Sequence, residues 1–424
     1  MNRPPPSLTL YALAARALSP LAPLLLRARA RGGKEDPARL GERLGHASLP
    51  RPEGRLAWLH GVSVGESLSL LPLIDRLRAA RPGEPVLVTS GTRASAEVLA
   101  RRLPAGAIHQ YAPVDTPAAV GRFLDHWRPD LGVFVESELW PNLIAGAKRR
   151  GARLALVSAR LSAASVRRWG WAPGAAQAVL GAFDLLLARD EAAAAAFRAL
   201  GVRVDGVADL KFAAALLPAD EAELARLRAA LDERPVILGA STHGGEEAAI
   251  LDRFAAVAKD ANPRPLLILA PRHETRGAEV EGLALGMGFT VARRSAGAGP
   301  GGVDVYVADT VGDLGLWYRL AGLAVLGGSL IAGVGGHNPL EPARLGCPFV
   351  SGSHVETWPI YGALEAHGAT VCVAGAEGLD RYFRDVIEAP AALTARAGRA
   401  RDLIAMKDVE AREMTSRVLD LLTP

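Results

Sequence analysis

The stretch WLHGVSVGESLSLLPLIDRL, residues 58–77, changes its pattern near the middle. It begins as a short apolar run, breaks at small residues, and continues with the spacing of a helix. The break places Glu66 directly after Gly65, at or near the start of the predicted helix. A buried strand followed by a turn and a helix is the repeating unit of a parallel α/β sheet. Pro72 lies inside the helical part, so we expect this helix to kink or to start late.

The same alternation of apolar runs and helical spacing continues along the chain. Each run is typical of a buried strand and is followed by turn residues or a helical pattern. A change of composition at residues 211–234 separates a first series from a second. We therefore predict an α/β protein with two Rossmann-like, doubly wound domains in tandem. The first series is LAWLH, PVLVTS, LGVFVE, RLALVS and FDLLLA, and the second is PVILGAS, PLLILAP, DVYVAD, LAVLGG and TVCVAG.

These patterns divide the chain into expected parts. The last of them is a long helix rich in Ala, Arg, Glu and Leu. The expected parts are an N-terminal membrane-associated segment at 1–34, a first domain at 35–210, a linker at 211–233, a second domain at 234–390 and the C-terminal helix at 391–424.

The N-terminal segment contains LTLYALAARALSPLAPLLL, residues 8–26, which is apolar except for Arg16 and two prolines. A membrane-spanning helix needs about 20 apolar residues, and this stretch just reaches that length. We expect it to span a bilayer or to lie in its interface, with the following basic residues against anionic lipid. An amphipathic helix packed on its own domain is the alternative. The basic residues are Arg27, Arg29, Arg31 and Lys34.

The bulk composition is that of a folded protein, with 50% hydrophobic and 22% charged residues among 424. A net charge of +4 is too small to indicate a nucleic-acid-binding protein. Cys347 and Cys372 lie beside apolar residues without a metal-binding spacing, so we expect two core thiols in a reducing compartment. Metal-binding and Walker motifs are missing from the sequence, which favours chemistry without a metal. A GxSxG motif is missing as well, which weakens a hydrolase interpretation.

Acidic residues follow two of the predicted strands in the first half. Ligands of open α/β sheets bind beyond the carboxyl ends of the strands. Glu66 can either stabilise the dipole of its helix or act as a general base. Glu136 and Glu138 should point to opposite sides of an extended chain, so at most one faces a ligand directly. Pro141 suits the first turn of the next helix. Lys211, in DLKF, is either a solvated surface residue or part of the site.

Glycine-rich turns follow the strands of the second half. GASTHGGEE, residues 239–247, could form an anion cradle at a helix start or only a capped helix. PRH at 271–273 and VGD at 311–313 also follow predicted strands. GGSLIAGVGGHNPLEPARLG, residues 327–346, is the strongest candidate for a phosphate or sugar-nucleotide site. In this stretch Asn338 can cap a helix, Pro339 fits its first position and Glu341 lies in its first turn. A well-capped helix without a ligand remains the alternative.

In this order, the motifs resemble those of the 3-deoxy-D-manno-octulosonic acid (Kdo) transferase family of lipopolysaccharide biosynthesis. The matching pieces lie between residues 39 and 343, and ESELWPN together with GGHNPLEPA is the most specific combination. The pieces are RLGERLG, WLHGVSVGE, ESELWPNL, LKF, ASTHGGEE, PRH, DTVGD and GGHNPLEPA.

The resemblance implies a GT-B fold, in which the active site lies between two Rossmann-like domains. It implies an inverting glycosyltransferase that moves Kdo from CMP-Kdo to a lipid A precursor, without a metal or other cofactor. The implied partners are therefore CMP-Kdo, the lipid A precursor and inner-membrane lipid, and no nucleic acid. The implied location is the cytoplasmic face of the inner membrane.

The resemblance also implies roles for individual residues. Glu66 matches the proton acceptor, and Glu136 and Lys211 match positions that stabilise the transition state. The implied contacts to CMP are Arg272, His273, Val311, Gly312, Asp313, Asn338, Pro339, Leu340 and Glu341.

Two other classes of protein remain open at this point. Another GT-B enzyme, such as a different glycosyltransferase or a nucleotide-sugar epimerase, would share the glycines of the second half. It would not need ESELWPN or an apolar N-terminal segment. A two-domain sugar-binding protein without activity would need neither a base at the first turn nor a lipid-facing segment.

Overall fold

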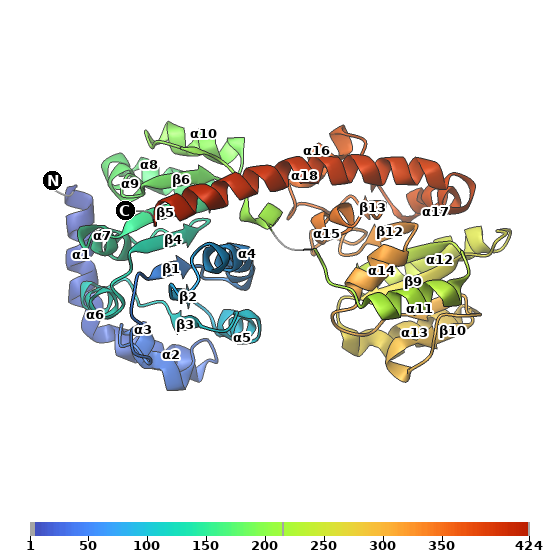
Figure 1. The fold of residues 1–424 in the computed structure, drawn as a ribbon, viewed down its shortest axis with the longest axis horizontal. Coiled ribbons are helices and arrows are strands. Elements are labelled where there is room, and N and C mark those ends of the chain that lie inside the picture. The colour runs from blue at the N-terminus through green and yellow to red at the C-terminus, as the bar shows by residue number, and fades with distance from the viewer. Residues whose placement is uncertain (1–4, 214–215, 423–424) are drawn as a thin grey trace. The chain divides into compact units, whose positions relative to one another are not determined.

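The computed structural model describes residues 5–213 and 216–422 and divides the chain into two compact units (Figure 1). Unit 1 comprises residues 1–214 and 407–424, and unit 2 comprises residues 215–406. This division differs from the expected one, because residues 215–233 belong to unit 2 instead of forming a linker. The long C-terminal helix α18 (Pro390–Asp420) is shared by the two units. Its end joins unit 1 because Ala411, Met414 and Val418 are buried in the core there.

Unit 1 is built on a sheet of parallel strands in the order β3-β2-β1-β4-β5-β6-β7. The chain starts in the middle, extends to one edge and returns to the other, so β1 and β4 are neighbours at the switch point. The predicted doubly wound arrangement is thereby confirmed for this unit. The strands are β1 (Ala57–His60), β2 (Val86–Ser90), β3 (Ala107–Tyr111), β4 (Leu131–Val135), β5 (Arg153–Ala159), β6 (Leu185–Ala188) and β7 (Gly206–Val207).

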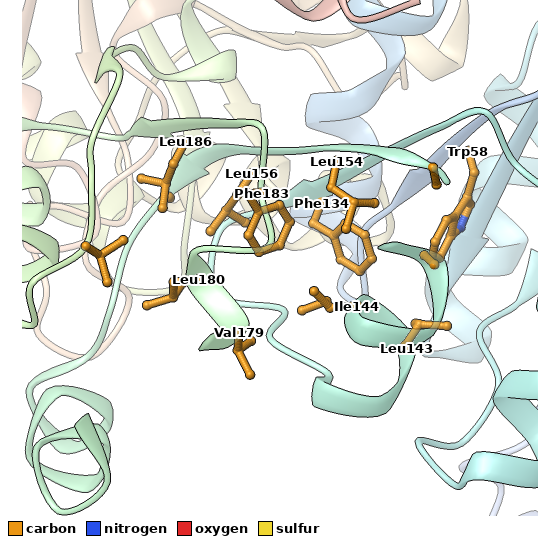
Figure 2. Packing of buried hydrophobic residues seen from close by; sticks show 14 of the residues in the cluster. Trp58, Phe134, Leu143, Ile144, Leu154, Leu156, Val179, Leu180, Phe183 and Leu186 are labelled. Carbon is orange, nitrogen blue, oxygen red and sulfur yellow. The ribbon is translucent and has the colours of Figure 1, made fainter. Parts of the chain in front are cut away.

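The apolar runs of unit 1 are buried strands, because helices cover both faces of the sheet. All residues of β1, β2 and β4 are buried. Figure 2 shows the core on one face, where aromatic and aliphatic side chains of the strands meet those of the helices α7 (Pro141–Arg149) and α9 (Pro173–Leu180). The rings of Trp58 and Phe134 pack edge to face with centroids 5.0 Å apart. This packing fixes the strand ends from which the acidic residues emerge.

Several helices of unit 1 begin at side chains that accept hydrogen bonds from their first turns. Ser63, Thr92, Thr116 and Asp190 are such N-caps. The helices are α3 (Leu40–Arg43), α4 (Val64–Ala80), α5 (Arg93–Arg102), α6 (Pro117–Trp127), α7 (Pro141–Arg149), α8 (Ala163–Gly170), α9 (Pro173–Leu180) and α10 (Glu191–Ala199), with the short 3-10 helices η2 (Pro37–Arg39) and η3 (Leu210–Ala213).

Two proline predictions in unit 1 have different outcomes. Pro141 is the first residue of α7, as predicted. Pro72 lies inside α4, which already starts at Val64, so the expectation of a late start is wrong. The cap at Ser63 satisfies the first turn ahead of the proline, and a proline removes only one N–H donor from the helix.

Unit 2 contains a second sheet of parallel strands, in the order β10-β11-β9-β8-β12-β13-β14. Its switch point lies between β8 and β12, and β11 is inserted between β9 and β10. The predicted Rossmann-like character is confirmed here too. The strands are β8 (Val236–Thr242), β9 (Leu266–Pro271), β10 (Val291–Arg293), β11 (Val305–Val307), β12 (Leu323–Leu326), β13 (Phe349–Gly352) and β14 (Cys372–Val373).

Helices surround this second sheet, and α11 packs against α14 within unit 2. Cys347 is buried as expected, whereas Cys372 is half-buried because β14 is the short edge strand. The helices are α11 (Glu221–Leu231), α12 (Glu246–Ala258), α13 (Gly277–Gly286), α14 (Leu314–Leu320), α15 (Leu340–Arg344), α16 (Ile360–Ala366) and α17 (Leu379–Glu388), with the 3-10 helices η4 (Glu274–Arg276), η5 (Arg294–Ala296) and η6 (Ala376–Gly378).

The N-terminal segment is helical, comprising α1 (Pro6–Leu18), the 3-10 turn η1 (Ser19–Leu21) and α2 (Ala22–Arg31). By length and composition, this helical stretch could cross a membrane. It also contacts its own unit, since α1 lies beside α6 and Tyr11 donates a hydrogen bond to Asp115. Its outward leucines remain exposed. They are Leu10, Leu13, Leu18, Leu21, Leu24 and Leu25.

Candidate active site

Glu66 lies in the first turn of α4, directly after the end of β1. Its Oε2 accepts a hydrogen bond from the Val62 N–H at 2.7 Å, and its Oε1 accepts one from the Ser63 hydroxyl at 2.9 Å. The Ser63 hydroxyl also accepts from the Glu66 N–H, and the Ser63 N–H donates to Glu66 Oε2 at 3.5 Å, so the two residues form a capping box. A Cβ at Gly61 would lie 3.1 Å from the Glu66 Cβ, so glycine lets the helix start close to the strand. Glu66 therefore serves as a helix cap, and its half-buried carboxylate retains lone pairs for another donor.

Glu138 is a second carboxyl group near Glu66. Its Oε2 accepts a hydrogen bond from Trp140 Nε1 at 2.9 Å. The pKa of Glu138 is raised to about 7, mainly by burial and also by the nearby negative charges of Glu66 and Glu136, while the hydrogen bond from Trp140 acts to lower it. The family resemblance implied no role for this residue. Its proximity to Glu66 arises because β1 and β4 are adjacent in the sheet.

The raised pKa of Glu138 predicts a pH dependence of stability. The folded protein binds the Glu138 proton more tightly than the unfolded chain does. The contribution of this proton to the free energy of unfolding is therefore complete below about pH 4.5 and is lost as the pH rises through about 7. The melting temperature of the wild type should therefore fall relative to that of Glu138→Gln between pH 5 and pH 8. Thermal unfolding at each pH checks this. Glu97→Gln, at an exposed position of α5, is the control, and a constant difference would contradict the assignment.

Glu136 and Lys211 belong to a charged cluster at the ends of β4, β5 and β7, and Glu136 also acts on Glu138. Glu136 has a φ of 59° and pairs with Arg160 at 2.6 Å, so the chain leaves β4 in a turn rather than extended. The expected alternation of Glu136 and Glu138 therefore does not apply. Asp209 accepts from the Lys211 N–H at 3.0 Å, and the charges of Lys211, Arg189 and Glu136 all act on it. Burial nevertheless raises the pKa of Asp209.

The three residues expected to be catalytic therefore lie in one charged network of unit 1. The charges of Glu66 and Glu136 both interact with that of Glu138. The charge of Glu136 also interacts with that of Asp209, which lies beside Lys211. Two residues of this network have positive φ values: Glu136, directly after β4, at 59°, and Ser158, near the end of β5 and hydrogen-bonded to Asp209, at 50°. Strained backbone of this kind concentrates at functional sites.

Unit 2 has a pocket of about 270 Å³ at the carboxyl ends of β8, β9 and β11. Arg272, Val311 and Gly312 line it, as does Trp317 of α14. Asp313 plays a different part, because it accepts hydrogen bonds from Arg294 Nε and the Thr310 hydroxyl, both at 2.6 Å. Asp313 thus fixes the turn that carries Val311 and Gly312.

The Asn338–Glu341 corner lies near Arg272. Asn338 Nδ2 donates to Glu341 Oε1 at 3.1 Å, and Asn338 Oδ1 accepts from the Leu340 N–H at 3.0 Å. Pro339 is the N-cap residue of α15, so the helix begins at the buried Leu340, one residue later than predicted. Burial raises the pKa of Glu341, while Asn338, Arg344 and Arg272 act to lower it. The side chains of Glu341 and Arg272 are thus close enough to contact the same ligand.

Two histidines that were not predicted as site residues lie near Arg272 and contact each other. The rings of His243 and His337 are stacked, and their Nε2 atoms are 2.9 Å apart. Burial lowers the pKa of His337 to about 4, with the charges of His243 and Arg272 acting in the same direction. His273, which was selected, is exposed, and its ring lies 6.2 Å from that of His243. A histidine in GASTHGG and another in GGHN were the only sequence signal for the pair.

Glu246 changes the interpretation of both glycine-rich turns. Its fully buried carboxylate accepts backbone hydrogen bonds from His243, Gly328, Ser329 and Leu330, at 2.9, 2.7, 3.1 and 2.9 Å. The amides of Gly328, Ser329 and Leu330, in the stretch predicted to bind a phosphate or sugar nucleotide, therefore hold a carboxylate of the protein itself. Sequence alone could not reveal this, since the partners lie more than 80 residues apart.

Within residues 5–213 and 216–422, no group of three or more His, Cys, Asp or Glu side chains is arranged to hold a metal ion. The expectation that the reaction needs no metal stays a prediction.

Known proteins resemble this chain over most of its length. A family model described as 3-deoxy-D-manno-octulosonic-acid transferase (kdotransferase) matches residues 38–214. The 3-deoxy-D-manno-octulosonic acid transferase of Bordetella pertussis is 39% identical over 359 residues, which cover 81% of this chain and 82% of that one. The transferase of the same name from Haemophilus influenzae is 32% identical over 398 residues, 91% of each chain.

Two solved structures share the fold at low sequence identity. A glycosyltransferase from Rickettsia africae has a TM-score of 0.55 and 11% identity, covering 88% of this chain and all of its own. UDP-GlcNAc 2-epimerase from Neisseria meningitidis has a TM-score of 0.53 and 14% identity, covering 84% of this chain and all of its own. These likenesses concern the GT-B type of fold, whereas the close relatives define the family. The chain therefore belongs to the 3-deoxy-D-manno-octulosonic acid transferase family and is a glycosyltransferase.

Proposed function

We propose that the protein transfers Kdo from CMP-Kdo to a lipid A precursor, with inversion at the anomeric carbon, during lipopolysaccharide biosynthesis. The observation that carries the proposal is the carboxylate of Glu66, fixed at the end of β1 by Val62 and Ser63 and close to Glu138. Inversion by a single displacement needs one base behind the attacking hydroxyl and a stabilised leaving group on the other side.

Glu66 is the proposed general base. Its hydrogen bonds to Val62 and Ser63 hold the carboxylate in one orientation, which limits the rearrangement needed when it accepts a proton. Each carboxylate oxygen can accept more than one hydrogen bond, so an acceptor hydroxyl can still reach it. Attack on the anomeric carbon then proceeds as the hydroxyl proton moves to Glu66.

Glu136 and Lys211 are proposed to stabilise the transition state. The ion pair with Arg160 fixes Glu136, and the contacts with Asp209 fix the backbone at Lys211. Groups that are held in place before the reaction stabilise developing charge without the cost of reorganisation. The strained turn at Glu136 supports such a fixed arrangement.

The cytidylate of CMP-Kdo is proposed to bind to unit 2. The exposed guanidinium of Arg272, in the pocket with Val311 and Gly312, suits the phosphate that leaves with negative charge. Glu341, oriented by Asn338, can accept hydrogen bonds from the ribose hydroxyls. His273, Asp313, Pro339 and Leu340 complete the proposed donor site, the last three by holding its turns.

The reaction is proposed to take place at the cytoplasmic face of the inner membrane, with the acceptor lipid held in that membrane. The exposed leucines of α1 and α2 support an association with lipid. We propose no metal, no other cofactor and no nucleic-acid partner.

Replacing Arg272 with alanine should weaken CMP binding by about 10- to 100-fold, because a hydrogen bond to a charged group contributes about 1.5–3 kcal/mol. Isothermal titration calorimetry with CMP measures this directly. Arg381→Ala, at an exposed position of α17, is the control and should bind CMP like the wild type. An unchanged dissociation constant for Arg272→Ala would remove this residue from the donor site.

The decisive experiment incubates the full chain with CMP-Kdo and a tetra-acylated lipid A precursor and analyses the products by mass spectrometry. The expected result is a lipid heavier by one or more Kdo residues, together with released CMP. No transfer would contradict the proposal. Thermal protection distinguishes other GT-B enzymes, because CMP should raise the melting temperature and UDP should not.

A further inference from the structure

Unit 1 contains a pocket of about 450 Å³ that the proposed chemistry does not use. Its walls come from three places: α1, the turn that carries Glu138, and the region of α8 and α9. Leu8, Trp140 and Trp169 are among the apolar side chains that line it, and all three also pack against the core of the unit. The volume and the mainly apolar lining are those of a site for a small ligand or part of a larger one.

We propose that this pocket binds one hydrocarbon chain of the lipid acceptor. The inference rests on the proposed function and extends it, because it gives part of the acceptor a place in unit 1. The pocket is bounded on one side by α1, whose outer leucines are exposed and apolar. On another side it is lined by Glu138, whose charge interacts with that of Glu66. It therefore connects an apolar surface suited to lipid with the proposed base.

The charges around the pocket suit an amphiphile with an anionic head. Arg168 lines the pocket and is exposed, and Arg167 precedes it on α8. Guanidinium groups at the edge of an apolar site bind phosphate while the chain enters the site. Trp171, between α8 and α9, is 92% exposed. Exposed tryptophan is typical of the level of lipid headgroups.

The wall formed by α1 is fixed to the rest of the unit. Tyr11 lines the pocket and donates a hydrogen bond to Asp115 Oδ2 at 2.9 Å. The Asp115 carboxylate also accepts from the N–H groups of Asn142 and Leu143, at 3.1 and 2.8 Å, at the start of α7. The same carboxylate thus holds α1 and the helix that follows the Glu138 turn. An apolar pocket built in this way is formed before its ligand arrives.

The test compares acceptors with and without acyl chains. Ala172→Trp, at a half-buried position that lines the pocket, should fill it. Ala178→Trp, at an exposed position of α9, is the matched control. Filling should raise the KM for the acylated lipid A precursor by about tenfold or more. The KM for the deacylated, water-soluble precursor should stay unchanged, as should both values for the control.

Equal effects on both acceptors, or none on either, would overturn the proposal while leaving Kdo transfer intact. The proposal would also be overturned if Ala172→Trp no longer sedimented with phosphatidylglycerol vesicles while its KM values stayed unchanged. The pocket would then bind membrane lipid and not the acceptor. A second measurement needs no transfer. Brominated dodecyl phosphate should quench less fluorescence in Trp169→Phe than in the wild type, and equal quenching would overturn the pocket assignment whether or not the enzyme is active.

Discussion

Glu66→Ala is expected to lower kcat by about 10²–10⁴-fold, the usual contribution of a general base, while CMP binding to unit 2 stays at the wild-type level. The carboxylate is the only part of the side chain that can take the acceptor proton, so Glu66→Gln should lose a similar factor. The measurement is steady-state transfer from CMP-Kdo to the lipid A precursor, with calorimetry for CMP. Turnover near the wild-type level in both variants would show that Glu66 is not the base.

Because Glu66 also caps α4, its loss has a structural effect that must be separated from the chemical one. Loss of an N-cap interaction costs about 1 kcal/mol of stability. Ser63→Ala removes the serine half of the same capping box and keeps the carboxylate. We expect Ser63→Ala to lose stability like Glu66→Ala but to retain most of its turnover. If the two variants lost turnover equally, the capping role would account for the effect.

Glu246→Ala is expected to destabilise unit 2 by on the order of 4 kcal/mol, because it leaves four backbone N–H groups without their buried acceptor. For a unit of this size, the melting temperature should fall by roughly 8–16 °C. Differential scanning calorimetry measures the change. Glu356→Ala, at an exposed position of the same unit, should melt like the wild type.

An added anion tests the cause of this loss. Formate or acetate can occupy the space left by the Glu246 carboxylate and should raise the melting temperature of the variant more than that of the wild type. Glu246→Gln keeps the shape and one oxygen acceptor, so its stability should lie between those of Glu246→Ala and the wild type. A shift of less than about 3 °C in Glu246→Ala would contradict the arrangement of donors around the carboxylate.

Much of the architecture could be predicted because it depends on local patterns. A short apolar run followed by helical spacing identifies a buried strand and its helix, since both periods are fixed by backbone geometry. The corner at residues 58–77 illustrates this: β1, the turn and α4 follow the sequence pattern closely. Pro141 at the start of α7 is another local effect, because its missing N–H would be unpaired there in any case.

The candidate site could be predicted only in part. The positions after the strands were identifiable, because ligands of parallel sheets bind at those ends. The partners of each side chain were not. The ion pair of Glu136 with Arg160 depends on how β4 and β5 end beside each other. The chain also turns at Glu136, so the side chains of Glu136 and Glu138 do not alternate as they would in an extended strand. The stacked His243 and His337 come from stretches 94 residues apart.

The sequence by itself determined ten of the described strands, the helix starts near Glu66 and at Pro141, the parallel α/β class and the family, because each of these depends on neighbouring residues or on short motifs. The strands β3, β7, β10 and β13 were not predicted. Only the tertiary structure decided that α18 ends in the core of unit 1 and that Glu138 lies close to Glu66. It alone also decided that the Glu246 carboxylate accepts hydrogen bonds from the amides of a glycine-rich turn. The physical reason is that burial, charge interactions and hydrogen-bond partners depend on distances in space, which strand order sets between residues far apart in the chain.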